Sequence, residues 1–143
     1  MDDYKEYEKK RDNNIKRNNK YLDEFQKWLI GKGLKTKTIN SHTLNADLYI
    51  NEFLNYYDVC KMEDGINELN GFFDDWFVRK CLWSTAYSTK STAASIKKFY
   101  NCMQELGYIT KEDYAFVCNV IKEEMDNWIY TVEDYNNFTD FDF

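Results

Sequence analysis

The near absence of helix-breaking residues constrains the fold more than any other feature of the sequence. Among 143 residues there is no proline, and there are only five glycines. Proline and glycine are the residues that most often interrupt helices and form tight turns. The sequence therefore predicts long helices with few interruptions, and it disfavours a turn-rich β-protein.

Large apolar residues are numerous enough to build a core. Ten Phe, twelve Tyr and four Trp are too many for a disordered chain. A chain of this length folds as a single domain that buries about 68–70% of its unfolded surface. No apolar run approaches the roughly 18 residues that cross a bilayer, and no signal-like stretch opens the sequence. We therefore expect a cytoplasmic globular protein.

Apolar residues recur at helical spacing, and the segments end at glycines. They predict an all-α, compact bundle of four to five helices, over residues of about 5–30 or 13–30, 36–57, 62–81, 92–106 and 111–129. Residues 82–92, rich in Ser and Thr, are expected to form a loop. A hydroxyl of Thr36 or Thr38 is expected to cap the second helix, and Thr110 with Asp113 resembles a capping box.

The same pattern predicts the domain organisation. Residues 1–12 are polar all round and are expected to be frayed. Residues 13–129 form one helical domain with an extra C-terminal helix, and residues 130–143 form an acidic aromatic tail without a clear period.

Charge is segregated along the chain. The net charge is −6, yet residues 76–104 contain five basic residues and no acid, and residues 25–46 contain four lysines and no acid. By contrast, residues 47–75 carry a net charge of −7 and residues 105–143 one of −8. Two acid-free basic segments form a positive surface if the fold brings them together.

The residue inventory argues against an enzyme. His42 is the only histidine, so nucleophilic catalysis of the Ser-His or Cys-His kind has no other base. We interpret it as a packing or capping residue. The sequence has no glycine-rich phosphate loop. Its cysteines are not closely spaced, so we expect buried, reduced thiols and no metal or other cofactor; they lie at Cys60, Cys81, Cys102 and Cys118.

Two segments resemble the core-binding (SAM-like) N-terminal domain of tyrosine recombinases and phage integrases. Residues 33–39 are Gly-Leu-Lys-Thr-Lys-Thr-Ile, close to the Gly-Leu-Ser-x-x-Thr-Ile that opens the second helix of that domain. Residues 94–100 are Ala-Ser-Ile-Lys-Lys-Phe-Tyr, similar to the Ser-x-hydrophobic-basic-x-Phe-Tyr of its fourth helix. Leu106-Gly107-Tyr108-Ile109 then matches the glycine and apolar pair that end it. The resemblance spans about residues 21–109.

The departures from the family matter as well. His42 stands where the family often has Tyr, and Lys35 where it often has Ser. After Ile109 the chain begins another helix, where the family usually has a proline-containing linker to a catalytic domain. The catalytic set of two Arg, a Lys, His residues and a Tyr has no match here. The resemblance therefore implies a freestanding relative of the binding domain, or a fragment of a larger protein, without catalysis of its own.

The two motifs coincide with the two acid-free segments. In the family the corresponding helices lie against the duplex, so the resemblance implies a double-stranded DNA partner, contacted through phosphates and with weak sequence specificity. The expected contact residues are Lys32, Lys35, Lys37, Thr38, Lys90, Ser91, Thr92, Ser95, Lys97 and Lys98.

A second hypothesis starts from the acidic C-terminal segment. In that interpretation the chain keeps the helical scaffold but has lost DNA binding. It would then act as an acidic protein-interaction or regulatory domain that pairs with a separate recombinase or another protein, or mimics DNA.

Overall fold

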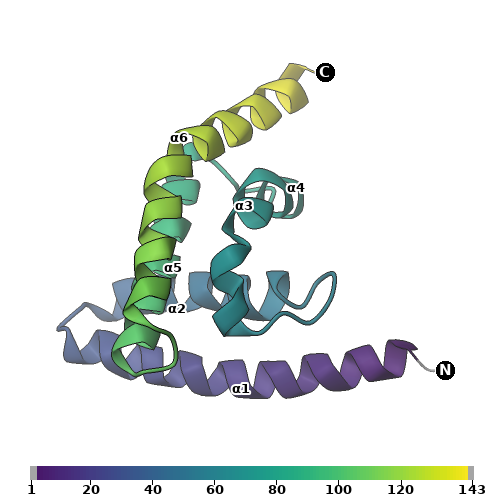
Figure 1. Cartoon of the computed structure of the whole chain (residues 1–143). Helices are drawn as coiled ribbons and strands as arrows, with labels where there is room; N and C mark the ends of the chain where they lie inside the picture. The colour runs from purple at the N-terminus through teal and green to yellow at the C-terminus, as the bar shows by residue number, and fades with distance from the viewer. Residues whose placement is uncertain (1–2, 142–143) are drawn as a thin grey trace.

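A computed structural model of the chain describes the backbone of residues 3–141 and the side chains of residues 3–137. Over that range every regular element is helical, which confirms the all-α prediction (Figure 1). The α-helices are α1 (Asp3–Gly31), α2 (Thr36–Asp47), α3 (Leu69–Gly71), α4 (Phe77–Lys80), α5 (Ala86–Glu105) and α6 (Lys111–Phe141). Between them lie two π-helices, η1 (Leu48–Phe53) and η3 (Phe72–Trp76), and one 3-10 helix, η2 (Met62–Asn67).

A glycine turn separates α1 from α2 as the sequence predicts. Gly33 has a φ of 79°, a left-handed conformation that glycine adopts without steric cost. Its N–H donates to Ile30 O over 2.9 Å. The predicted threonine cap is wrong, because Lys35 is the N-cap residue of α2 and no side chain bonds the first turn.

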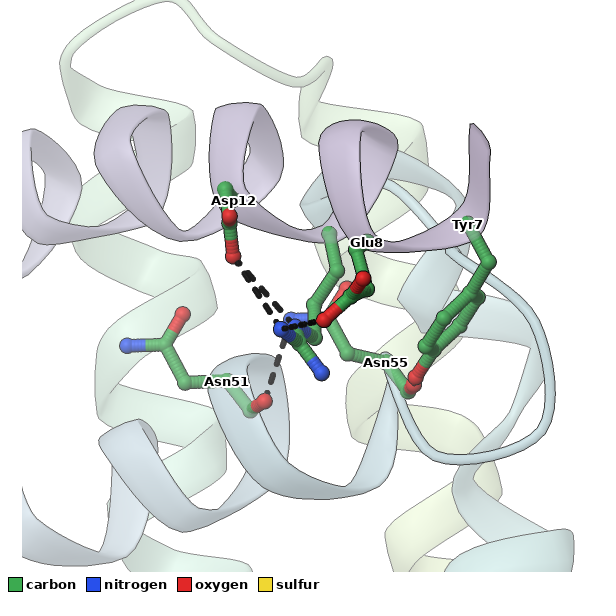
Figure 2. A network of polar contacts seen from close by, with 6 residues as sticks. Tyr7, Glu8, Asp12, Asn51 and Asn55 are labelled. Carbon is green, nitrogen blue, oxygen red and sulfur yellow. Dashed lines mark hydrogen bonds and ion pairs between the residues drawn. The ribbon is translucent and has the colours of Figure 1, made fainter. Parts of the chain in front are cut away.

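The expectation of a frayed N-terminus is not met in residues 3–12, which belong to α1. Polar contacts, some of them buried, hold the first half of α1 against η1 and the residues that follow it. Figure 2 shows Tyr7 of α1 beside Asn55, and the Tyr7 hydroxyl donates to the Asn55 carbonyl. Asn18 is fully buried and donates to Ile50 O over 3.0 Å. A search for apolar periodicity misses such an interface, because asparagine counts as polar.

Residues 62–81 do not form the single predicted helix. They divide into η2, α3, η3 and α4. The π-helical turn η3 faces the other π-helix, η1, across an aromatic cluster. Phe72 lies 5.1 Å from both Tyr49 and Phe53, measured between ring centroids. Phe72 and Phe73 are both buried; Phe72 packs against η1, and Phe73 stacks on Trp128 of α6, with ring centroids 4.4 Å apart.

Helix α5 begins at Ala86, so most of the predicted loop 82–92 is helical. The cause is a capping box. Ser88 N donates to Thr85 Oγ1 over 3.0 Å, and Thr85 N donates to Ser88 Oγ over 2.8 Å. Serine takes the place of the usual Glu or Gln, so the Ser/Thr-rich segment starts a helix instead of preventing one.

Helix α6 starts at the predicted capping box and runs further than predicted. Asp113 N donates to Thr110 Oγ1 over 3.0 Å, and Thr110 N donates to Asp113 Oδ2 over 3.1 Å. The helix continues to Phe141, so residues 130–141 of the predicted tail are helical; residues 142–143 lie outside the described range. In Figure 1 its second half runs over α4.

Helix α5 is the centre of the fold. Its most extensive contacts are with α6 and with α2. Phe99 of α5 packs edge-on against Phe25 of α1, with ring centroids 5.3 Å apart. Tyr100 is fully buried and donates its hydroxyl to Met62 O over 2.8 Å. The contact with Phe25 and the packing of α5 on α2 fix the position of α5 relative to the two helices that carry the first basic segment.

Candidate nucleic-acid interface

The two acid-free segments lie on helices that pack against each other. His42 Nδ1 of α2 is 2.7 Å from Ser95 Oγ of α5, and Asn45 of α2 donates to the same hydroxyl over 3.0 Å. Ser95 is only 1% exposed, so these bonds are shielded from competing water. One buried hydroxyl thus links α2 to α5, and the fold brings the two basic segments onto neighbouring elements.

The six predicted lysines are all exposed, and so is Thr38. Within the described part of the chain, no ion pair neutralises any of the six. Lys32 sits over the Trp28 ring, 4.9 Å from its centroid, and the Trp28 indole N–H donates to Glu105 over 3.0 Å. The lysines are Lys32, Lys35, Lys37, Lys90, Lys97 and Lys98. Their charges are therefore available to an anionic partner.

Helical geometry divides the lysines of α5 into two rows. Ser91, Ser95 and Lys98 follow one another at spacings of four and three, so they lie along the α2 side of the helix. Lys98 is close enough to His42 to affect its pKa. Lys97 is rotated by about 100° from Lys98 and shares a row with Lys90. Of the two adjacent lysines, Lys98 is therefore the one beside α2.

Two predicted phosphate contacts are corrected by the structure. Thr92 and Ser95 are each 1% exposed, because they lie on the same buried side of α5 as Ile96 and Phe99. Their hydroxyls cannot reach a phosphate at the surface. Ser91 is half-buried and stays in the candidate interface. The role of Ser95 is to join two helices, a role that only its neighbours in space reveal.

The distance between Ser95 Oγ and His42 Nδ1 is that of a catalytic serine and its base, but a substrate could not reach the serine. A nucleophilic serine must reach a substrate, and the Ser95 side chain is enclosed. Its hydroxyl also lies 3.2 Å from Ser91 O. The pair therefore acts as a packing contact between α2 and α5, in line with the interpretation of His42 from the sequence.

Three of the four thiols have raised pKa values. Burial raises the pKa of Cys60 and Cys81 to about 11 and that of Cys102 to about 12. Such thiols are protonated at neutral pH and are poor nucleophiles and metal ligands. Within the described residues, no group of three or more His, Cys, Asp or Glu side chains is placed to hold a metal ion.

We predict that protonation of His42 destabilises the fold. Burial lowers its pKa below the ordinary value of 6.5, and the charge of Lys98 lowers it further. The unfolded chain then binds the proton more readily than the folded one, so the free energy of unfolding falls as the pH drops through 6.5. Urea unfolding at pH 7 and pH 5 should show a smaller loss in His42→Gln than in the wild type. An identical pH dependence in both proteins would contradict this.

No helix of the described residues is both long enough and apolar enough to cross a membrane. In comparisons with known proteins, no protein-family model, curated protein or solved structure matches the chain.

Proposed function

We propose that the chain binds double-stranded DNA through the α2–α5 surface. This surface comprises Lys32 before α2, the N-cap residue Lys35, Lys37 and Thr38 of α2, and Lys90, Ser91, Lys97 and Lys98 of α5. The observation that carries the proposal is the bond between His42 and Ser95, because it joins two basic segments far apart in the sequence. The resemblance to core-binding domains of recombinases and integrases supports the same function.

The contacts in this proposal are to phosphates. Lysine ammonium groups act as point charges on the DNA backbone. The first turn of α2 adds backbone N–H groups that no side chain caps, and free N–H groups at a helix start attract phosphate. The acidic helix α6 lies outside this surface in the proposal, and its charge lowers binding at other faces.

We expect the surface to bind DNA with weak sequence preference, because it contains no arginine. Bidentate contacts from arginine to guanine are the commonest specific contacts in the major groove. Arg79 is already engaged by Asp75, over 2.7 and 3.0 Å, and Arg11 lies 3.4 Å from Asp12. Arg17 lies on α1, outside the proposed surface. The surface therefore has no arginine to read guanine, and its lysines bind the backbone of any duplex.

A titration of labelled duplex at several salt concentrations tests the proposal. Neutralising about 4–6 phosphates gives a plot of log affinity against log salt with a slope of about −4 to −5. Fluorescence anisotropy of two duplexes with the same composition and scrambled sequence should give similar affinities. Absence of salt-dependent binding even at low ionic strength would overturn the proposal.

A protein partner is the second candidate function, and one surface favours it. Leu82 is 92% exposed and Tyr87 is 82% exposed, at the junction of α4 and α5. Tyr87 lines a hollow with Glu133 and Asn136 of the acidic helix α6, and Asn136 donates to Ser84 O over 3.0 Å. If the duplex titration is negative, we infer that this surface, and not the lysines, carries the function.

A further inference from the structure

A basic pocket lies away from the α2–α5 surface. It has a volume of about 430 Å³ and opens between α1 and the segment that leads into η2. Its lining residues are Lys10, Asn13 and Arg17 of α1 with Val59 and Lys61. Three of these five side chains are cationic and none is a carboxylate. Each of the three charges raises the cost of bringing the others close, unless an anion occupies the pocket.

The wall of the pocket on α1 is a single face of the helix. Lys10, Asn13 and Arg17 are separated by three and four residues, and such residues are neighbours on a helix surface. Arg17, the nearest of the three to the basic segment, lies about 21 Å along the axis from Gly31 at the end of α1, at a rise of 1.5 Å per residue, and Lys32 follows Gly31. The pocket is therefore separate from the lysines of the proposed DNA interface.

One buried side chain fixes both walls of the pocket. Asn14 is fully buried; its Oδ1 accepts a bond from Arg17 Nη2 over 3.2 Å. Its amide nitrogen donates to Asn55 Oδ1 over 2.8 Å and to Cys60 O over 3.1 Å. Cys60 lies between the two lining residues Val59 and Lys61. The Arg17 guanidinium and the opposite wall are thus held in place before any ligand binds, which lowers the entropic cost of binding.

Arg11 and Arg79 form ion pairs with carboxylates, whereas Arg17 forms none among the described residues and can bind an anionic ligand. Figure 2 shows Glu8 and Asp12 on the first turns of α1, and both pair with Arg11, over 3.8 and 3.4 Å. Arg79 pairs with Asp75. Among the described residues, Arg17, Lys10 and Lys61 form no ion pair. The pocket therefore gathers cations that the protein itself leaves unneutralised.

We propose that this pocket binds a phosphate group. A guanidinium fork and two ammonium groups match the charge and the several acceptor oxygens of phosphate, and the Asn13 amide adds a neutral donor. The group is carried either by a small phosphorylated molecule or by a nucleic-acid backbone. The site does not depend on the DNA interface proposed above, because it uses none of the same residues.

The test uses inorganic phosphate as the probe and the full chain as the protein. The Nε–H resonance of Arg17 is followed by NMR as sodium phosphate is added, against sodium chloride at equal ionic strength. We expect a saturable shift with phosphate only. Lys10→Gln and Lys61→Gln should each weaken phosphate binding about tenfold, as expected for loss of a charge-assisted bond. Lys9→Gln, which removes an exposed lysine from the adjacent position of α1, should leave it unchanged.

Two results would overturn the proposal. The first is a shift that does not saturate or that chloride reproduces. The second is an equal loss of binding in Lys9→Gln and Lys10→Gln, since a general effect of net charge would produce it. Lys98→Glu should bind phosphate here as the wild type does, so failure of the DNA proposal is distinguishable. Duplex affinity of Arg17→Gln then identifies the source: a loss indicates a nucleic-acid phosphate, and no change a small phosphorylated molecule.

Discussion

Replacing Trp128 with alanine is expected to lower the free energy of unfolding by about 3–5 kcal/mol, the range for removal of a buried aromatic side chain. Trp128 of α6 is fully buried and stacks on Phe73, with ring centroids 4.4 Å apart. Its indole N–H donates to Asn70 Oδ1 over 2.9 Å. The substitution leaves a cavity and removes that bond. Urea unfolding followed by far-ultraviolet circular dichroism measures the loss.

Tyr130→Ala is the matched control for this prediction. Tyr130 lies two residues further along α6 and is 71% exposed, so its removal should change stability by no more than about 0.5 kcal/mol. The comparison tests whether α6 is part of the folded core. If Trp128→Ala were as stable as Tyr130→Ala, the packing of α6 on η3 described above would be incorrect.

Lys98→Glu is expected to weaken duplex binding about tenfold and to reduce the salt slope by about 1, as for the loss of one phosphate contact. Lys98 lies beside α2, where it acts on the pKa of His42. The substitution removes one cation and adds one anion where the two basic helices meet. Fluorescence anisotropy with a labelled duplex, at several salt concentrations, measures both quantities.

Two other charge reversals sharpen this prediction. Lys122→Glu makes the same change on the exposed face of α6 and should leave affinity nearly unchanged. Lys97→Glu makes it one residue before Lys98, about 100° around α5, and should cause a smaller loss than Lys98→Glu. Equal losses in all three variants would indicate a response to net charge alone. The α2–α5 surface would then not be the binding site.

Apolar periodicity predicted most helices correctly and placed several of their ends. The Gly33 turn and the Thr110–Asp113 capping box are local features, and the structure contains both. The start of α5 was missed because its capping box uses Ser88 in place of a Glu or Gln. The division of residues 62–81 was missed because Phe72, Phe73, Trp76 and Phe77 are all buried. Their spacings of one, three and one are those of an ordinary α-helical stripe, so the pattern contains no sign of the π turn.

In the candidate site, too, the sequence predicted some features and only the tertiary structure decided others. The sequence indicates which lysines are free of neighbouring acids, and the structure shows all six of them exposed. Nothing local distinguishes Ser91, which stays near the surface, from Ser95, which lies inside and bonds His42. The two arginines of α1 differ already in the sequence, because Arg17 is flanked by asparagines. Arg11 has carboxylate neighbours within three positions, Glu8 and Asp12, but only the fold shows that Arg17, held by Asn14, lines a pocket with Val59 and Lys61.

The sequence by itself determined that this protein is helical, where most of its helices lie, and that its charge is segregated along the chain. These properties depend on residues within a few positions of one another. Tertiary structure alone decided that α2 packs on α5, that Thr92 and Ser95 are buried, and that Lys10, Arg17 and Lys61 line one pocket. Such facts depend on contacts between residues some 40 to 50 positions apart, and local spacing does not determine those contacts.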